Sequence, residues 1–132
     1  MEPIKAIKTD AGRIESGFIT ERLDCTVRAY AAALNVPYPV AHSIFKQRGR
    51  KDGHKCFNTL QTWRAEGLTS EVPPEPVTLR RFIETHQTGV YMVRVRGHVT
   101  TLKDGIVYDV STPRARAIVK DFVKVESKGG LQ

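Results

Sequence analysis

The dipeptide Asp104-Gly105 is the feature that most restricts the fold of this chain, because it lies between two β-rich runs. Asp-Gly is a preferred sequence for a two-residue turn between antiparallel strands. With such a turn, Thr100 lies opposite Asp109. His98, two positions from Thr100 on the same strand, then shares a face with Asp109. A three-residue turn would instead place Asp109 on the other face of the hairpin.

The last third of the chain predicts a β-sheet. It is rich in β-branched and aromatic residues, which are enriched in strands. The predicted strands cover residues 90–95, 98–102, 106–110 and 118–125. Because the connections within the hairpin region are short, neighbouring strands are expected to run antiparallel.

The middle of the chain predicts helices instead. Asp24 is a suitable N-cap for the alanine-rich run that follows it, in which apolar residues recur at helical spacing. The predicted helices cover residues 24–34, 39–48, 58–66 and 79–86. Helices followed by strands favour an α+β fold, with N-terminal helices packed on a C-terminal antiparallel sheet. We expect Phe57 and Trp63 in the core, and His42 at or near the surface.

The length of 132 residues fits one domain. We expect a single domain over residues 1–132, with residues 1–20 as an N-terminal lead-in and residues 127–132 as a loose tail. No apolar run approaches ~18 residues, so no membrane span is predicted. The first residues lack the apolar stretch of a secretory signal, which favours a cytoplasmic protein. In that reducing compartment Cys25 and Cys56 are expected to be free thiols.

The net charge is +7, from 21 Lys and Arg against 14 Asp and Glu. Part of the excess lies in three groups, which are Lys46, Arg48, Arg50, Lys51 and Lys55; Arg80, Arg81, Arg94 and Arg96; and Arg114, Arg116 and Lys120. A basic excess is compatible with an acidic partner or with nucleic acid. These cations are spread along the chain without a nucleic-acid-binding motif, so a solvated surface is the favoured interpretation. Any contact with nucleic acid is expected to be weak and non-specific, with a Kd of roughly 10⁻⁴ to 10⁻⁶ M.

Cys25, His98 and Asp109 are the candidate site residues. Cys25 begins the first predicted helix, where unpaired N–H groups carry partial positive charge and favour a thiolate. A histidine can take the thiol proton, and a carboxylate can fix the histidine tautomer. These are the parts of a Cys-His-Asp nucleophilic centre. Each residue also has an ordinary alternative, since cysteine is often a buried structural thiol and strand-end polar residues often bond to backbone.

Three segments carry this chemistry. They are Asp24-Cys25-Thr26-Val27-Arg28-Ala29, Gly97-His98 and Asp104-Gly105-Ile106-Val107-Tyr108-Asp109. Together they resemble the papain-like cysteine peptidase superfamily, especially its small bacterial and bacteriophage members, over roughly residues 20–112. The resemblance implies a papain-like fold and hydrolysis of an amide, isopeptide or thioester bond. By this resemblance Cys25 would be the nucleophile, His98 the base and then the acid, and Asp109 the orienting group.

The chain departs from that superfamily at the oxyanion hole. The superfamily usually places a Gln or Asn a few residues before the nucleophile, and residues 1–24 contain neither. The backbone N–H of Cys25 remains, and Thr20 and Arg22 are the candidate substitutes for the missing side chain. Loss of one oxyanion donor typically costs about 10²–10³ in rate. A slow, a very selective and an inactive protein are all compatible with this departure.

The preferred hypothesis is a cysteine hydrolase, peptidase- or isopeptidase-like, acting on a protein or peptide in the cytoplasm, or in the host cytoplasm if a phage encodes it. One alternative is a weak or inactive papain-like binding module that engages a host protein. A second is a basic nucleic-acid-binding protein. No cofactor and no metal is expected, because His54 and Cys56 lack a second Cys/His pair at zinc spacing.

Overall fold

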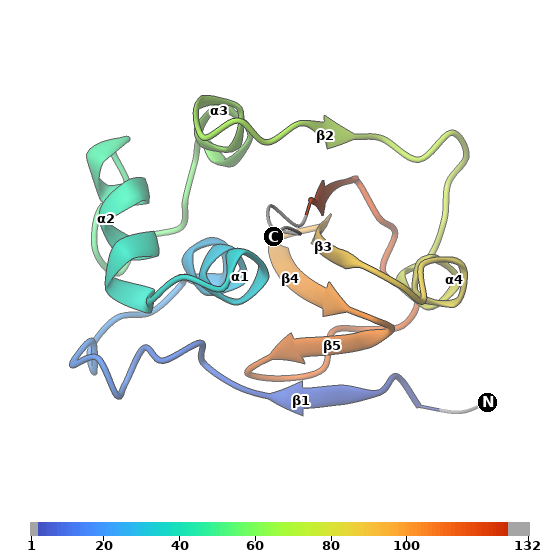
Figure 1. Cartoon of the computed structure of the whole chain (residues 1–132), viewed down its shortest axis with the longest axis horizontal. Helices are drawn as coiled ribbons and strands as arrows, with labels where there is room; N and C mark the ends of the chain where they lie inside the picture. The colour runs from blue at the N-terminus through green and yellow to red at the C-terminus, as the bar shows by residue number, and fades with distance from the viewer. Residues whose placement is uncertain (1–2, 127–132) are drawn as a thin grey trace.

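The computed structural model describes residues 3–126, and Figure 1 shows how its helices and strands are arranged. The helices are α1 (Cys25–Leu34), α2 (Tyr38–Gln47), α3 (Thr59–Ala65) and α4 (Leu79–Thr85). The strands are β1 (Ala6–Lys8), β2 (Ser70–Glu71), β3 (Val90–Val95), β4 (His98–Lys103), β5 (Ile106–Asp109) and β6 (Asp121–Val125). Every predicted helix and strand is present, and the predicted α+β class is confirmed. The tail predicted at residues 127–132 lies outside the described residues.

The strands form a mixed sheet in the order β1-β5-β4-β3-β6-β2. β1 pairs in parallel with β5, with Ala6 opposite Val107 and Lys8 opposite Asp109. The other neighbouring strands are antiparallel. The prediction of an antiparallel sheet is therefore wrong at this edge, and the lead-in predicted over residues 1–20 contains a strand. β1 has three residues, all exposed, which is too short for an alternating hydrophobic pattern to reveal it.

The turn between β4 and β5 contains two residues, as the sequence predicts. Asp104 and Gly105 have positive φ angles of 48° and 82°, which is the combination found in a type I′ turn. Lys103 consequently lies opposite Ile106. This register brings the first residue of β4 and the last residue of β5 onto one face of the hairpin.

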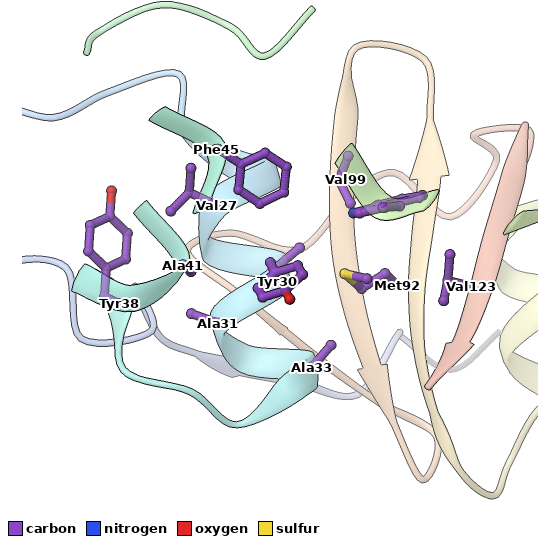
Figure 2. Packing of buried hydrophobic residues seen from close by; sticks show 12 residues of the cluster. Val27, Tyr30, Ala31, Ala33, Tyr38, Ala41, Phe45, Met92, Val99 and Val123 are labelled. Atoms are coloured by element: carbon purple, nitrogen blue, oxygen red, sulfur yellow. The ribbon is translucent and has the colours of Figure 1, made fainter. Parts of the chain in front are cut away.

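The sheet separates two hydrophobic cores. In the first, Val27 and Tyr30 of α1 pack with Met92, Val99 and Val123 of the sheet, as Figure 2 shows. The second core, beside α4, contains Leu79, Phe82, Ile83, Tyr91, Val93, Leu102, Val107 and Val119. Successive residues of a strand point to opposite faces, so β3 contributes to both cores. The packing of α1 on β4 fixes the start of the helix beside the hairpin.

Individual side chains depart from the sequence-based expectations in two places. Trp63 is fully buried, as predicted. Phe57 is 76% exposed because it precedes α3 in a loop, so its predicted place in the core is wrong. His42 is buried, not superficial, because its ring lies on the inner side of α2 against Phe18 and Tyr38.

Candidate active site

Cys25 is the first residue of α1, and its side chain is half-buried. The preceding Asp24 occupies the N-cap position of α1, as predicted, but its side chain makes no capping hydrogen bond. Its carboxylate instead accepts hydrogen bonds from Arg13 (3.2 Å), Arg28 (3.0 Å) and Tyr38 (2.8 Å). Guanidinium donors stabilise a buried carboxylate more than a neutral N–H does. The negative charge beside the thiol is thereby compensated.

His98 begins β4 and Asp109 ends β5, and their side chains are hydrogen-bonded, with 2.7 Å between Nε2 and Oδ2. The same carboxylate oxygen accepts a hydrogen bond of 2.6 Å from Thr100 Oγ1. The predicted contact between His98 and Asp109 is therefore confirmed. Because Nε2 faces the carboxylate, Nδ1 is the ring nitrogen that remains to accept the proton of the Cys25 thiol.

The charges of the site favour a thiolate paired with an imidazolium. Burial opposes a lower pKa for Cys25, but hydrogen bonding with His98 and with the Val99 backbone, together with the charges of His98 and Arg28, lowers it below its ordinary value. Hydrogen bonds with Asp109 and Cys25 raise the pKa of His98 to about 9. Burial also opposes ionisation of Asp109, yet its hydrogen bonds, first that with His98, lower its pKa. A deprotonated thiol is the reactive form of a cysteine nucleophile.

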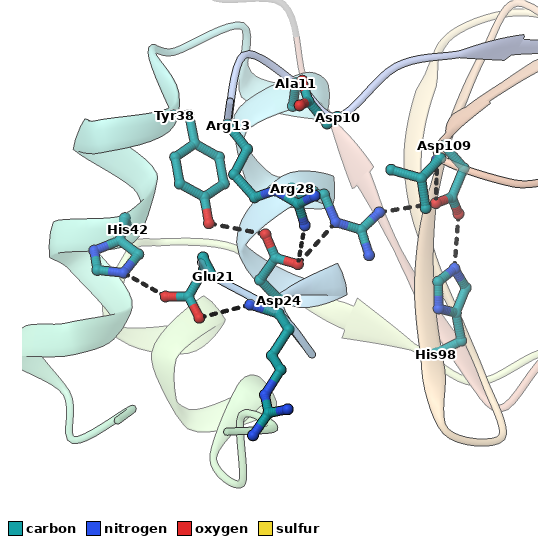
Figure 3. Close-up of polar contacts among 12 residues, drawn as sticks. Asp10, Ala11, Arg13, Glu21, Asp24, Arg28, Tyr38, His42, His98 and Asp109 are labelled. Carbon is teal, nitrogen blue, oxygen red and sulfur yellow. Dashed lines mark hydrogen bonds and ion pairs between the residues drawn. The ribbon is translucent and has the colours of Figure 1, made fainter. Parts of the chain in front are cut away.

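Arg28 connects the acidic groups on the two sides of the site, and the sequence did not identify it. Its Nε donates to Asp24 Oδ1 and its Nη1 to Asp109 Oδ1, both at 3.0 Å. Figure 3 shows its guanidinium between the two carboxylates. Burial opposes a higher pKa for Arg28, but the two carboxylates raise it. The signal available in the sequence is helical spacing, because Arg28 lies four residues after Asp24.

The two candidate oxyanion residues lie in a different cavity from the thiol. Thr20 and Arg22 are exposed and line a hollow together with Phe18 and Gly53. Cys25 lines a narrow cavity between α1 and the β4–β5 hairpin. The backbone N–H at the start of α1, which the Asp24 side chain leaves uncapped, is the oxyanion donor nearest to the thiol by position.

Glu21, His42 and Asp52 are the residues that could hold a metal ion, because their ligand atoms lie within 4.8 Å of one another. Glu21 is already bound by Arg50, whose Nη1 and Nη2 donate to it at 3.0 and 3.1 Å, and by the Gly53 N–H at 2.6 Å. Burial opposes ionisation of Glu21, but the Arg50 hydrogen bond lowers its pKa to about 2. An added cation would meet the positive charge of Arg50, which is buried and not part of the solvated surface predicted for it. The group is an ion-pair network.

Both cysteines are free, as the sequence predicts. Cys56 is half-buried at the edge of the first core, and its Sγ donates to Asn58 Oδ1 at 3.4 Å. The two thiols therefore have different surroundings, because Cys25 lies beside His98 and Cys56 beside Asn58.

No family model, no curated protein and no solved structure matches this chain. Among residues 3–126, no helix combines the length and the apolar character needed to cross a membrane.

Proposed function

We propose that the protein is a cysteine hydrolase, peptidase- or isopeptidase-like, that cleaves an amide-type or thioester bond through Cys25, His98 and Asp109. The observation that carries the proposal is the 2.7 Å hydrogen bond between His98 Nε2 and the buried Asp109 carboxylate. The coupling of His98 with Cys25, which raises one pKa and lowers the other, supports it further. The proposal includes a papain-like arrangement, in which the nucleophile lies on a helix and the base and the acid lie on the sheet that follows it.

In this mechanism the Cys25 thiolate attacks the carbonyl carbon of the substrate, and the carbonyl electron pair moves onto oxygen. The Cys25 backbone N–H stabilises that oxyanion. When the C–N or C–S bond breaks, His98 gives its proton to the leaving group, and a thioester with Cys25 remains. His98 then takes a proton from water, which attacks the thioester and releases the acid and the thiolate. Asp109 keeps the imidazole oriented throughout.

The proposal is tested with Cys25→Ala and His98→Ala on a panel of peptide, isopeptide and thioester substrates. Both variants are expected to lose hydrolysis, because residues that act as one catalytic unit fail together. Cys56→Ser is the matched control and should retain it, and thermal melting verifies that each variant folds. Hydrolysis that survives in Cys25→Ala would exclude this mechanism.

A binding module without turnover is the second candidate function. The observation that favours it is the incomplete oxyanion hole, since residues 1–24 contain no Gln or Asn and the cavity of Thr20 and Arg22 is separate from Cys25. Such a module would hold a protein partner in the cytoplasm, for example a host protein if a phage encodes the chain. Mass spectrometry after incubation with a peptide thioester separates the two functions. An acyl adduct on Cys25 favours the hydrolase, and a thiol of ordinary reactivity favours the module.

A further inference from the structure

The loop over residues 49–58 connects the two sides of the candidate site. At one side, a Cβ on Gly53 would lie 3.8 Å from Arg22 Nε. At the other side, a Cβ on Gly97 would lie 3.6 Å from Lys55 Nζ. Arg22 belongs to the segment that leads into the nucleophile, and Gly97 directly precedes the base. The loop therefore contacts both the segment that precedes Cys25 and the turn that precedes His98.

Positive charge around this loop is left uncompensated. Arg22, Lys55 and Arg96 are exposed, and none of them forms an ion pair among residues 3–126. The acids at the site are all paired. The pairs are Glu21 with Arg50, Asp24 with Arg13 and Arg28, Asp109 with Arg28 and His98, and Asp52 with His42 and Lys46. Such an excess of positive charge attracts negatively charged groups to the site.

Two large apolar side chains are exposed in the same segments. Leu23 is 51% exposed and Phe57 is 76% exposed. Leu23 has a φ of 53°, a left-handed conformation that is unfavourable for a residue with a Cβ. Backbone strain of this kind is concentrated at functional sites. A strained and exposed leucine two residues before the candidate nucleophile therefore indicates a role in binding.

The site rim is defined as Arg22, Leu23, Lys55, Phe57 and Arg96. We propose that the site rim binds an acidic segment of polypeptide that carries an apolar side chain, and presents its backbone carbonyl to Cys25. This inference rests on the proposed hydrolase function and names its substrate class. Carboxylates of the substrate meet the cations, and its apolar side chain meets Leu23 or Phe57. A hydrolase of this kind needs a carbonyl carbon, which the phosphodiester backbone of a nucleic acid lacks.

The charge of the rim is measured with thiol reagents of opposite sign. In a Cys56→Ser background, Cys25 reacts with anionic sulfonatoethyl methanethiosulfonate or with cationic trimethylammonioethyl methanethiosulfonate. We expect the anionic-to-cationic rate ratio to exceed that of the urea-unfolded protein about 10-fold at low salt. The excess should disappear at ~1 M NaCl, where the screening length is about 3 Å. Lys55→Glu should lower the ratio several-fold, whereas Lys124→Glu, at an exposed position of β6, should leave it unchanged.

Substrate preference is measured as binding to the Cys25→Ala variant. The probe is a fluorescent peptide of about twelve residues in which glutamate alternates with leucine and glycine. We expect it to bind at least about 10-fold more tightly than the same peptide with lysine in place of glutamate, and than single-stranded DNA of equal charge. Lys55→Glu should remove the preference. Leu23→Gly should weaken binding without lowering Tm, because glycine tolerates a positive φ.

Three results would overturn the inference. They are equal binding of the two peptides, tighter binding of the DNA, and a reagent ratio that Lys55→Glu leaves unchanged. Neither measurement requires turnover, so its outcome is independent of the hydrolase assay. If the glutamate peptide is preferred while hydrolysis is absent, the rim is supported and the hydrolase function fails. If substrates are hydrolysed without any preference for acidic segments, the hydrolase stands and the rim is refuted.

Discussion

His98 is the residue on which the candidate chemistry depends, because it interacts with the acid and with the thiol at once. Its Nε2 is bonded to Asp109, and its interaction with Cys25 favours the thiolate. The aspartate is in turn held by Thr100 and Arg28 at 2.6 and 3.0 Å. The reactivity of one thiol is therefore set by a chain of contacts that begins on α1, crosses the hairpin and returns to α1.

Alkylation at pH 6–7 is expected to modify Cys25 before Cys56. The lowered pKa of Cys25 gives it a larger thiolate fraction at that pH. In His98→Ala the pKa should rise, and each unit of the rise reduces the rate at this pH about tenfold. Iodoacetamide labelling followed by peptide mass mapping measures both rates. Faster labelling of Cys56, or equally slow labelling of both thiols, would contradict this expectation.

Arg28→Met is expected to destabilise the protein by about 3–5 kcal/mol, because it leaves the buried Asp109 without its guanidinium partner and Asp24 with Arg13 as its remaining guanidinium partner. It should also raise the pKa of Cys25, whereas Arg28→Lys should preserve much of that pKa. Urea unfolding measures stability, and the pH profile of alkylation measures the pKa. The second readout tests positioning, since a purely structural role would change stability and leave the pH profile in place.

The matched control is Arg81→Met. Arg81 forms a surface pair with Glu84, with side chains 68% and 53% exposed. Such a pair contributes little, so the change should stay within about 0.5 kcal/mol. A similar loss of stability in both variants would show that the two buried ion pairs of Arg28 contribute no more to stability than an exposed pair does.

At the scale of elements, the turn between β4 and β5 determines which way Asp109 points. Strand side chains alternate between faces, so a change of one residue in the turn would move the carboxylate away from His98. The conformation of Gly105 is therefore tied to the geometry of the site, although Gly105 lies in the turn, at the opposite end of the hairpin from His98 and Asp109.

Gly105→Ala is expected to destabilise the protein more than Gly17→Ala. Both glycines have positive φ, 82° and 93°, which costs a residue with a Cβ about 1–2 kcal/mol. A Cβ at Gly105 would also lie 2.8 Å from Gln87 Oε1, whereas a Cβ at Gly17 would meet no atom of another residue within 4 Å apart from its chain neighbours. Displacing Gln87 breaks its hydrogen bond to the Ile83 carbonyl, adding about 0.5–1.5 kcal/mol. Urea unfolding compares the two, and equal losses would refute the steric part of the argument.

The elements were predictable because their signals are local. Helical spacing after Asp24 and the Asp104-Gly105 turn each lie within a short stretch of sequence, and the turn also fixed the contact of His98 with Asp109. The remaining features depend on residues distant in sequence. β1 is a strand because it pairs in parallel with β5, which lies about 100 positions later in the chain. The Asp24 side chain bonds to Arg13 and Tyr38, from other segments, and not to the N–H groups of α1.

Across the whole molecule, buried ion pairs join the segment before α1 to the rest of the fold. Glu21 is bound by Arg50 from the loop after α2 and by His42 from α2 itself. Asp24 is bound by Tyr38 at the start of α2. These contacts place α1 against both α2 and the loop after it, so the position of the candidate site depends on groups outside it.

Stability is expected to decline as pH falls from 4.5 toward 2. Burial opposes ionisation of Glu21, but its Arg50 hydrogen bond lowers the pKa from 4.5 to about 2. A lowered folded-state pKa gives stability that is fully present above the unfolded value and is lost as pH falls through the folded value. Glu21→Gln should therefore be less stable than the wild type at pH 7, and the difference should vanish near pH 2. Urea unfolding over this range measures it, and a difference independent of pH would contradict the assignment.

Arg28 and Asp109 lie 81 positions apart in the chain, yet they are hydrogen-bonded to each other in the cavity that Cys25 lines. During translation the segment with Cys25 is made first, and the hairpin follows much later. At roughly 5–20 residues per second, the delay is on the order of several seconds. Throughout that time the cysteine has neither its histidine nor the bridged carboxylate, so it is an ordinary thiol. Cys25 therefore meets the side chains that lower its pKa only after the β4–β5 hairpin has been synthesised.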